Sequence, residues 1–78
     1  MRAPKPEDPS VETLSAALIY LLSRYAQTGC PRLAVCVARH LECLATHGDA
    51  APVLRDTCAG LRGPWQQLAD PADRKAVH

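Results

Sequence analysis

The chain has 78 residues and a formal net charge of +1, with 47% hydrophobic and 22% charged residues. A chain of this length forms one small domain that buries about 60–65% of the surface its unfolded state exposes. The near-neutral charge argues against a global electrostatic attraction to nucleic acid or to an anionic membrane. The apolar runs are too short to span a bilayer and no signal peptide is recognisable, so we expect a cytoplasmic protein.

The apolar residues are mainly small and aliphatic, because the chain has no Phe, one Trp and two Tyr. A core of this kind favours helices. Arginine greatly outnumbers lysine among the basic residues, which is typical of a GC-rich and hence bacterial coding sequence. For the four cysteines we expect free thiols, because disulfides persist mainly in exported proteins.

The N-terminal residues 1–9 are rich in proline and charge, and we expect a disordered or extended arm. A helix follows, with Asp8 as N-cap and Pro9 at the first helical position, or with Ser10 as the competing cap. Apolar residues then recur every three or four positions and define one helical stripe: Val11, Leu14, Leu18, Leu21, Leu22 and Tyr25. Ile19 and Tyr20 point away from the centre of this stripe, so a monomer would cover them least well.

A second helix is predicted from Pro31 to Gly48, after Gly29 ends the first. The short connection makes the two helices antiparallel neighbours. Asp49 is then the expected cap of a third helix with Pro52 in its first turn. We expect this helix to stop at Gly63 and a short fourth helical turn to follow around Trp65. One kinked helix that continues through the proline is the alternative.

The sequence therefore predicts an all-α fold, a small three-helix bundle of antiparallel helical hairpins with a short fourth turn near the C-terminus. The helical domain occupies residues 10–69, and residues 70–78 read as a frayed tail. The predicted core consists of Leu14, Leu18, Leu21, Tyr25, Leu33, Val37, Leu41, Leu44, Leu54, Leu61 and Trp65.

The second predicted helix has an apolar arc wider than the stripe of about 100° that a surface helix needs. One border of this arc carries two cysteines and two histidines spaced four, three and four apart: Cys36, His40, Cys43 and His47. In the simplest interpretation the helix contacts both other helices, with the cysteines packed inward and the histidines at the rim.

A zinc site is the second interpretation, because a Cys and a His four residues apart on a helix can bind one ion. The set from Cys36 to His47 spans about 16 Å of helix axis at 1.5 Å per residue, so it cannot close around one ion alone. Cys30, Cys58 or a second copy of the helix would have to supply the missing ligands. Zinc is therefore a possible cofactor, and without it we expect none.

Catalysis and DNA binding have weaker support. A thiol and an imidazole on one helix lack an orienting third group and an oxyanion hole, so we do not expect an enzyme or a small-molecule substrate. A helix-turn-helix-like DNA contact would use the arginines Arg24, Arg32, Arg39, Arg55 and Arg62. The third helix offers few side chains that read bases, so we expect these arginines to be solvated and nucleic acid not to be a partner.

The expected function is a small protein-interaction module that self-associates through apolar surface of its first two helices, with a homodimer as the simplest product. The expected interface residues are Ile19, Tyr20, Val35, His40, Cys43 and His47.

Overall fold

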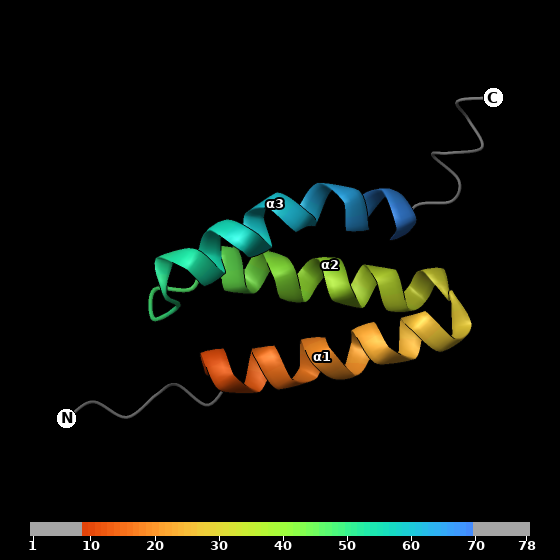
Figure 1. The fold of residues 1–78 in the computed structure, drawn as a ribbon, viewed down its shortest axis with the longest axis horizontal. Coiled ribbons are helices and arrows are strands. Elements are labelled where there is room, and N and C mark those ends of the chain that lie inside the picture. Colours follow the sequence, from red (N-terminus) through yellow and green to blue (C-terminus); the bar gives the residue numbers. More distant parts are fainter. Residues whose placement is uncertain (1–8, 70–78) are drawn as a thin grey trace.

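The computed structural model describes residues 9–69, which form three α-helices and no strand. The helices are α1 (Val11–Thr28), α2 (Pro31–Ala45) and α3 (Pro52–Ala69). Figure 1 shows α2 lying between α1 and α3 and running antiparallel to both. The all-helical prediction is thus confirmed over this range. The predicted N-terminal arm, apart from Pro9, and the predicted C-terminal tail lie outside it.

Ser10, and not Asp8, caps α1. The Ser10 hydroxyl oxygen accepts a hydrogen bond of 3.1 Å from the backbone N–H of Thr13, and Pro9 precedes the helix. The cap supplies an acceptor to one of the N–H groups that a helix start leaves unpaired. At the other end Gly29 takes the left-handed conformation, with φ of 67°, and its N–H donates to the Tyr25 carbonyl oxygen.

Helix α2 begins at Pro31 as predicted but ends at Ala45, before the predicted end at Gly48. The helical hydrogen-bond pattern ends at Thr46, whose backbone N–H still donates to the carbonyl oxygen of Glu42, because the next N–H, that of His47, donates to Leu44 instead of Cys43. The chain after Thr46 is then free to turn toward α3.

The start of α3 also differs from the prediction. Asp49 is not its cap, since the helix begins at Pro52 and the Arg55 N–H donates to the Ala51 carbonyl oxygen. The backbone N–H of Asp49 instead donates to His47.

The predicted stop at Gly63 is wrong, because α3 continues through Pro64 to Ala69. Trp65 therefore lies within α3 and not in a separate fourth turn. The glycine before the proline and the exposed carbonyl four residues before it explain the continuation. Gly63 has no Cβ to collide with the proline ring, which normally disfavours helical backbone at the preceding residue. Gly60 occupies the position whose carbonyl loses its helical donor to the proline, and it is exposed, so water can replace that donor.

The core is centred on α2. Its buried cluster comprises Leu14, Val37, Leu41, Leu44 and Cys58, which come from all three helices. Val11, Leu18, Leu21, Ala45, Leu54 and Trp65 are partly buried and pack against it. Burying one such aliphatic side chain stabilises the fold by about 1.5–3 kcal/mol. The wide apolar arc of α2 is thus covered by two neighbouring helices, since α2 packs against both α1 and α3.

The core differs from the predicted set in three respects. Leu61 is 44% exposed, so its assignment to the core was wrong, whereas Cys58 is buried and was not in the predicted set. The alanines Ala34, Ala38 and Ala50 are also buried. Tyr25 and Leu33 are half-buried. In the described part of the chain no helix has both the length and the hydropathy that crossing a bilayer requires.

Candidate functional site

On the border of α2 that carries two cysteines and two histidines, the burial of the two residue types is the reverse of the prediction. Cys36 and Cys43 are exposed, whereas His40 and His47 are half-buried. The expectation of inward cysteines and rim histidines is therefore wrong. The physical reason is that each imidazole has at least one hydrogen bond to the backbone, and no buried side-chain nitrogen or oxygen in the described residues is left without a partner.

His40 makes one local hydrogen bond. Its Nδ1 lies 2.7 Å from the carbonyl oxygen of Cys36, one turn earlier in α2. A carbonyl oxygen only accepts, so Nδ1 carries the proton and Nε2 has a free lone pair. Of the two histidines on this border, His40 is thus the one that can accept a hydrogen bond or bind a metal ion.

His47 joins two distant parts of the chain. Its Nδ1 accepts a hydrogen bond of 3.0 Å from the backbone N–H of Asp49, so its proton is on Nε2. Nε2 then donates to the carbonyl oxygen of Pro9 at 3.2 Å. Both ring nitrogens are therefore used. His47 thus links the start of α1 to the turn between α2 and α3 through hydrogen bonds. The sequence pattern did not reveal this structural role.

The four candidate metal ligands do not converge. Within residues 9–69 no group of three or more His, Cys, Asp or Glu side chains is placed to hold a metal ion. Cys58 does not join the candidates either, because it is buried in the core cluster. Burial also raises the pKa of the Cys58 thiol, since removing water disfavours the thiolate.

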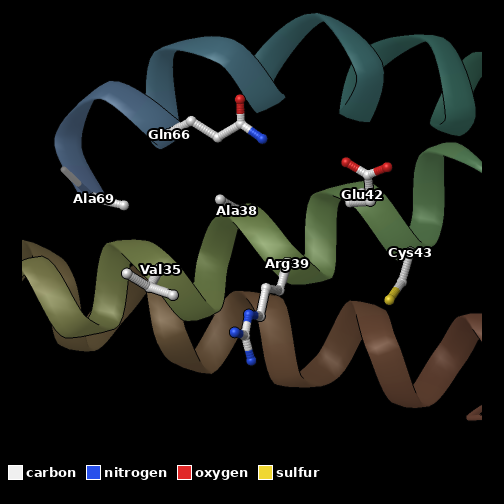
Figure 2. A pocket seen from close by; sticks show the side chains of 7 residues that line it. All are labelled: Val35, Ala38, Arg39, Glu42, Cys43, Gln66 and Ala69. Atoms are coloured by element: carbon white, nitrogen blue, oxygen red, sulfur yellow. The ribbon is translucent and has the colours of Figure 1, made fainter. Parts of the chain in front are cut away.

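An open groove of about 640 Å³ lies between α2 and the last turns of α3. Figure 2 shows the side chains that line it: Val35, Ala38, Arg39, Glu42, Cys43, Gln66 and Ala69. The expected interface residues Val35 and Cys43 therefore face this groove, on the outer side of α2. Ile19 and Tyr20, which lie on α1, are not among the residues that line it.

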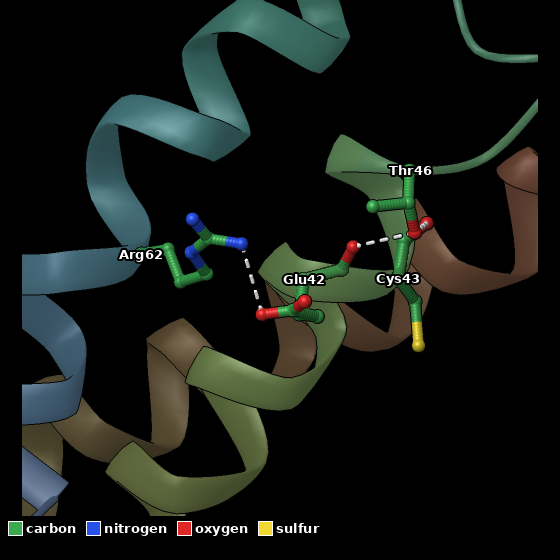
Figure 3. Close-up of polar contacts among 4 residues, drawn as sticks. All are labelled: Glu42, Cys43, Thr46 and Arg62. Carbon is green, nitrogen blue, oxygen red and sulfur yellow. Dashed lines mark hydrogen bonds and ion pairs between the residues drawn. The ribbon is translucent and has the colours of Figure 1, made fainter.

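An ion pair between Arg62 and Glu42 links α3 to α2 near this groove. The Arg62 guanidinium donates to Oε1 of Glu42 at 3.0 Å, and the two side chains are 38% and 52% exposed (Figure 3). A pair with this much solvent contact contributes at most about 1 kcal/mol. It nevertheless shows which side of α3 faces α2.

The arginines considered for DNA binding are spread over the three helices. Arg24, Arg32 and Arg39 are exposed, whereas Arg55 and Arg62 are half-buried. Arg62 is neutralised by Glu42. Arg24 lies over the ring of Tyr20, with its guanidinium carbon 5.9 Å from the ring centroid. At least these two arginines are thus engaged within the chain.

The most exposed apolar side chains lie on α1 and α3. On α1, Ile19 is 65% and Tyr20 is 60% exposed, as their positions off the stripe predict. Leu22, Val53 and Leu61 are also exposed, at 36%, 73% and 44%. Sequence reasoning missed these three as surface residues. Leu22 and Leu61 both sit on apolar stripes, and spacing alone cannot tell the centre of a stripe from its edge.

In comparisons with known proteins, no protein family, no curated protein and no solved structure matches the chain.

Proposed function

We propose that this chain is a small helical protein-interaction module that self-associates through the apolar surface of α1. The observation that carries the proposal is the exposure of Ile19 and Tyr20, at 65% and 60%, on neighbouring positions of one helix. Single exposed apolar residues are ordinary, but adjacent large ones on a helix that also exposes Leu22 are typical of an interface.

The size of the chain supports the same proposal. A domain of 78 residues buries a smaller share of its apolar surface than a larger domain does. The described core has five buried members in its central cluster, so additional burial between two chains would stabilise the fold appreciably. Self-association is the simplest way for such a chain to bury Ile19 and Tyr20.

Helix α2 contributes less to this surface than the sequence leads one to expect. None of the exposed large apolar side chains in the described residues belongs to α2. Val35 is half-buried, and His47 is engaged with Pro9 and Asp49. The proposal therefore assigns the contact mainly to α1.

The test is the molar mass of the full chain in solution, measured by light scattering over a concentration series to about 100 µM. We expect the mass to rise toward that of a dimer, and the variant Ile19→Ser to shift the transition to higher concentration. A matched control is Gln27→Ser, an exposed polar position on the same helix. A chain that remains monomeric throughout the series contradicts the proposal.

A further inference from the structure

Helix α3 contains residues that weaken a helix in its second half, whereas α1 and α2 have none beyond their first residue. These residues are Gly60, Gly63 and Pro64. Glycine and proline have the lowest helix propensities of all residue types. Pro64 also has no N–H, so the helical hydrogen bond to the carbonyl oxygen of Gly60 is missing. No contact with another helix requires either glycine, because a Cβ at each would meet open space. Residues 60–64 are therefore the intrinsically weakest part of α3.

The part of α3 before this point is anchored to the rest of the molecule. Cys58 is 2% exposed and belongs to the buried cluster to which all three helices contribute. Leu54 packs against the same cluster. The guanidinium of Arg62 adds a hydrogen bond to Glu42 of α2, although this ion pair is exposed and therefore weak. Residues 52–62 are thus held in place mainly by buried contacts.

The part of α3 after Pro64 has fewer anchors. None of residues 65–69 is buried, since Trp65, Leu68 and Ala69 are half-buried and the two glutamines between them are exposed. The indole of Trp65 packs against the core cluster, and its ring centroid lies 5.0 Å from that of Tyr25. Residues 65–69 therefore depend for their position largely on one aromatic side chain.

Residues 65–69 also form one wall of the groove between α2 and α3. Gln66 and Ala69 line the groove from α3, and its other five lining residues belong to α2 (Figure 2). Helix α2 packs against both other helices, so its wall is fixed from two sides. The wall on α3 lies beyond the weak part of that helix. A change in the direction of α3 at residues 63–64 would therefore change the width of the groove.

We propose that Gly63 and Pro64 form a hinge at which residues 65–69 swing away from α2 and back, which opens and closes the groove while the rest of the fold stays in place. The structure shows the closed state, which the contact between Trp65 and Tyr25 stabilises. Opening breaks only the helical hydrogen bonds that cross the hinge, and Pro64 has already removed one of them. The inference goes beyond the proposed function, because the hinge needs no second copy of the chain.

Hydrogen exchange of the full chain tests the hinge at the amides of Gln66 and Gln67. Their helical acceptors lie four residues earlier, on the other side of the hinge. Pro64→Ala restores the missing donor, and we expect it to slow exchange at both amides at least about tenfold. Thr57→Ala is the matched control, because it replaces an exposed residue of the same helix before the hinge. We expect it to change the two exchange rates less than about twofold.

Two other kinds of opening would give a different result. Fraying from the end of α3 leaves residue 64 helical, so neither variant would slow exchange at Gln66 and Gln67. Exchange through unfolding of the whole domain would respond to any variant that stabilises α3, including Thr57→Ala. A slowing by Pro64→Ala that does not exceed the slowing by Thr57→Ala therefore overturns the hinge.

Fluorescence gives a second measurement, because Trp65 is the only tryptophan of the chain and reports on residues 65–69. In wild-type protein titrated with urea, we expect the fluorescence to change at a lower concentration than the circular dichroism of the helices. In Pro64→Ala we expect the two transitions to coincide, because closing the hinge more firmly leaves one cooperative unit. Coincident transitions in the wild type would contradict a segment that opens separately.

Discussion

Trp65 packs edge-on against Tyr25, with ring centroids 5.0 Å apart and an interplanar angle of 73°. This contact joins α1 to α3, the two helices that are not consecutive in the chain. Edge-to-face aromatic pairs contribute about 0.5–1.5 kcal/mol beyond the area they bury. The pair therefore ties the C-terminal half of α3 to the rest of the molecule, although Pro64 precedes the tryptophan.

Removing this contact should destabilise the fold. We expect Trp65→Ala to lower the free energy of unfolding by about 2–4 kcal/mol, because it removes both packing against the core and the ring contact. The measurement is urea denaturation followed by circular dichroism. With Tyr25→Ala and the double variant, a thermodynamic cycle should return a coupling of about 0.5–1.5 kcal/mol. Strictly additive single variants would show that the rings do not interact in solution.

Replacing each of two glycines by alanine should change the stability of the protein in opposite directions. Gly60 lies inside α3 with open space where a Cβ would be, so Gly60→Ala should stabilise the protein by about 0.5–1 kcal/mol. Gly29 has a φ of 67°, a conformation that costs an L-residue roughly 1 kcal/mol, so Gly29→Ala should destabilise it. Thermal unfolding of both variants checks the pair. A loss of stability in Gly60→Ala would contradict the continuous helix through Pro64.

Cys58 should make stability fall at alkaline pH. Burial raises the pKa of its thiol above the ordinary value of 9.0. Above that pH the unfolded chain releases a proton that the folded chain retains, so unfolding becomes more favourable as pH rises toward the folded pKa. Below pH 9 this contribution to stability is fully present. The free energy of unfolding should therefore decline more steeply as the pH rises above 9.0 in the wild type than in Cys58→Ala.

The exposed thiols provide the control for that experiment. Cys43 is exposed, so Cys43→Ala should keep the alkaline slope of the wild type. Tyrosine and lysine ionise in the same range, which is why the difference between variants is the quantity to measure. Equal slopes for wild type and Cys58→Ala would show that the buried thiol does not carry the effect.

His47 should contribute to stability through its two hydrogen bonds. We expect His47→Ala to cost about 1 kcal/mol, because the Pro9 carbonyl and the Asp49 N–H both lose a partner but can reach water. Hydrogen exchange should also accelerate at the first turn of α1 and at the turn between α2 and α3. His40→Ala is the matched comparison, since His40 bonds only within its own helix. It should leave exchange at both places unchanged.

Zinc should leave the stability of the monomer unchanged. His47 uses both ring nitrogens, and no three candidate ligands converge in residues 9–69. A tight site present only in the folded state would raise the melting temperature once the zinc concentration exceeds its dissociation constant. We therefore expect the same melting temperature with equimolar zinc as with chelator. A rise that Cys36→Ser or His40→Ala abolishes would instead place a zinc site on this border of α2.

The sequence predicted helix boundaries correctly where a residue at the boundary acts through its own backbone conformation. Gly29 and Pro31 mark the end of α1 and the start of α2, because a left-handed glycine and a proline act through their own backbone angles. The stop at Gly63 failed for a related reason. A glycine followed by a proline usually ends a helix, and that rule predicted the stop, whereas here Gly63 lacks the Cβ that would collide with the proline ring, so α3 continues.

The candidate site was harder to predict than the helices. Spacing placed Cys36, His40, Cys43 and His47 on one border of α2, and it could not say which of them face inward. The burial of His47 depends on a hydrogen-bond partner from another segment, the carbonyl oxygen of Pro9, which lies just before the first turn of α1. Such a contact has no signature in local sequence.

The sequence by itself determined that this protein is all-helical and that consecutive helices run antiparallel, because periodicity, caps and short connections act within a few residues. Only the tertiary structure decided which apolar stripe positions are covered. Leu61 and Leu22 share stripes with Trp65 and Leu18 but remain exposed, because α1 and α3 each pack chiefly on α2 and leave the side between them open. Whether an apolar side chain is buried depends on where the neighbouring helices pack, and the sequence of its own helix does not specify this.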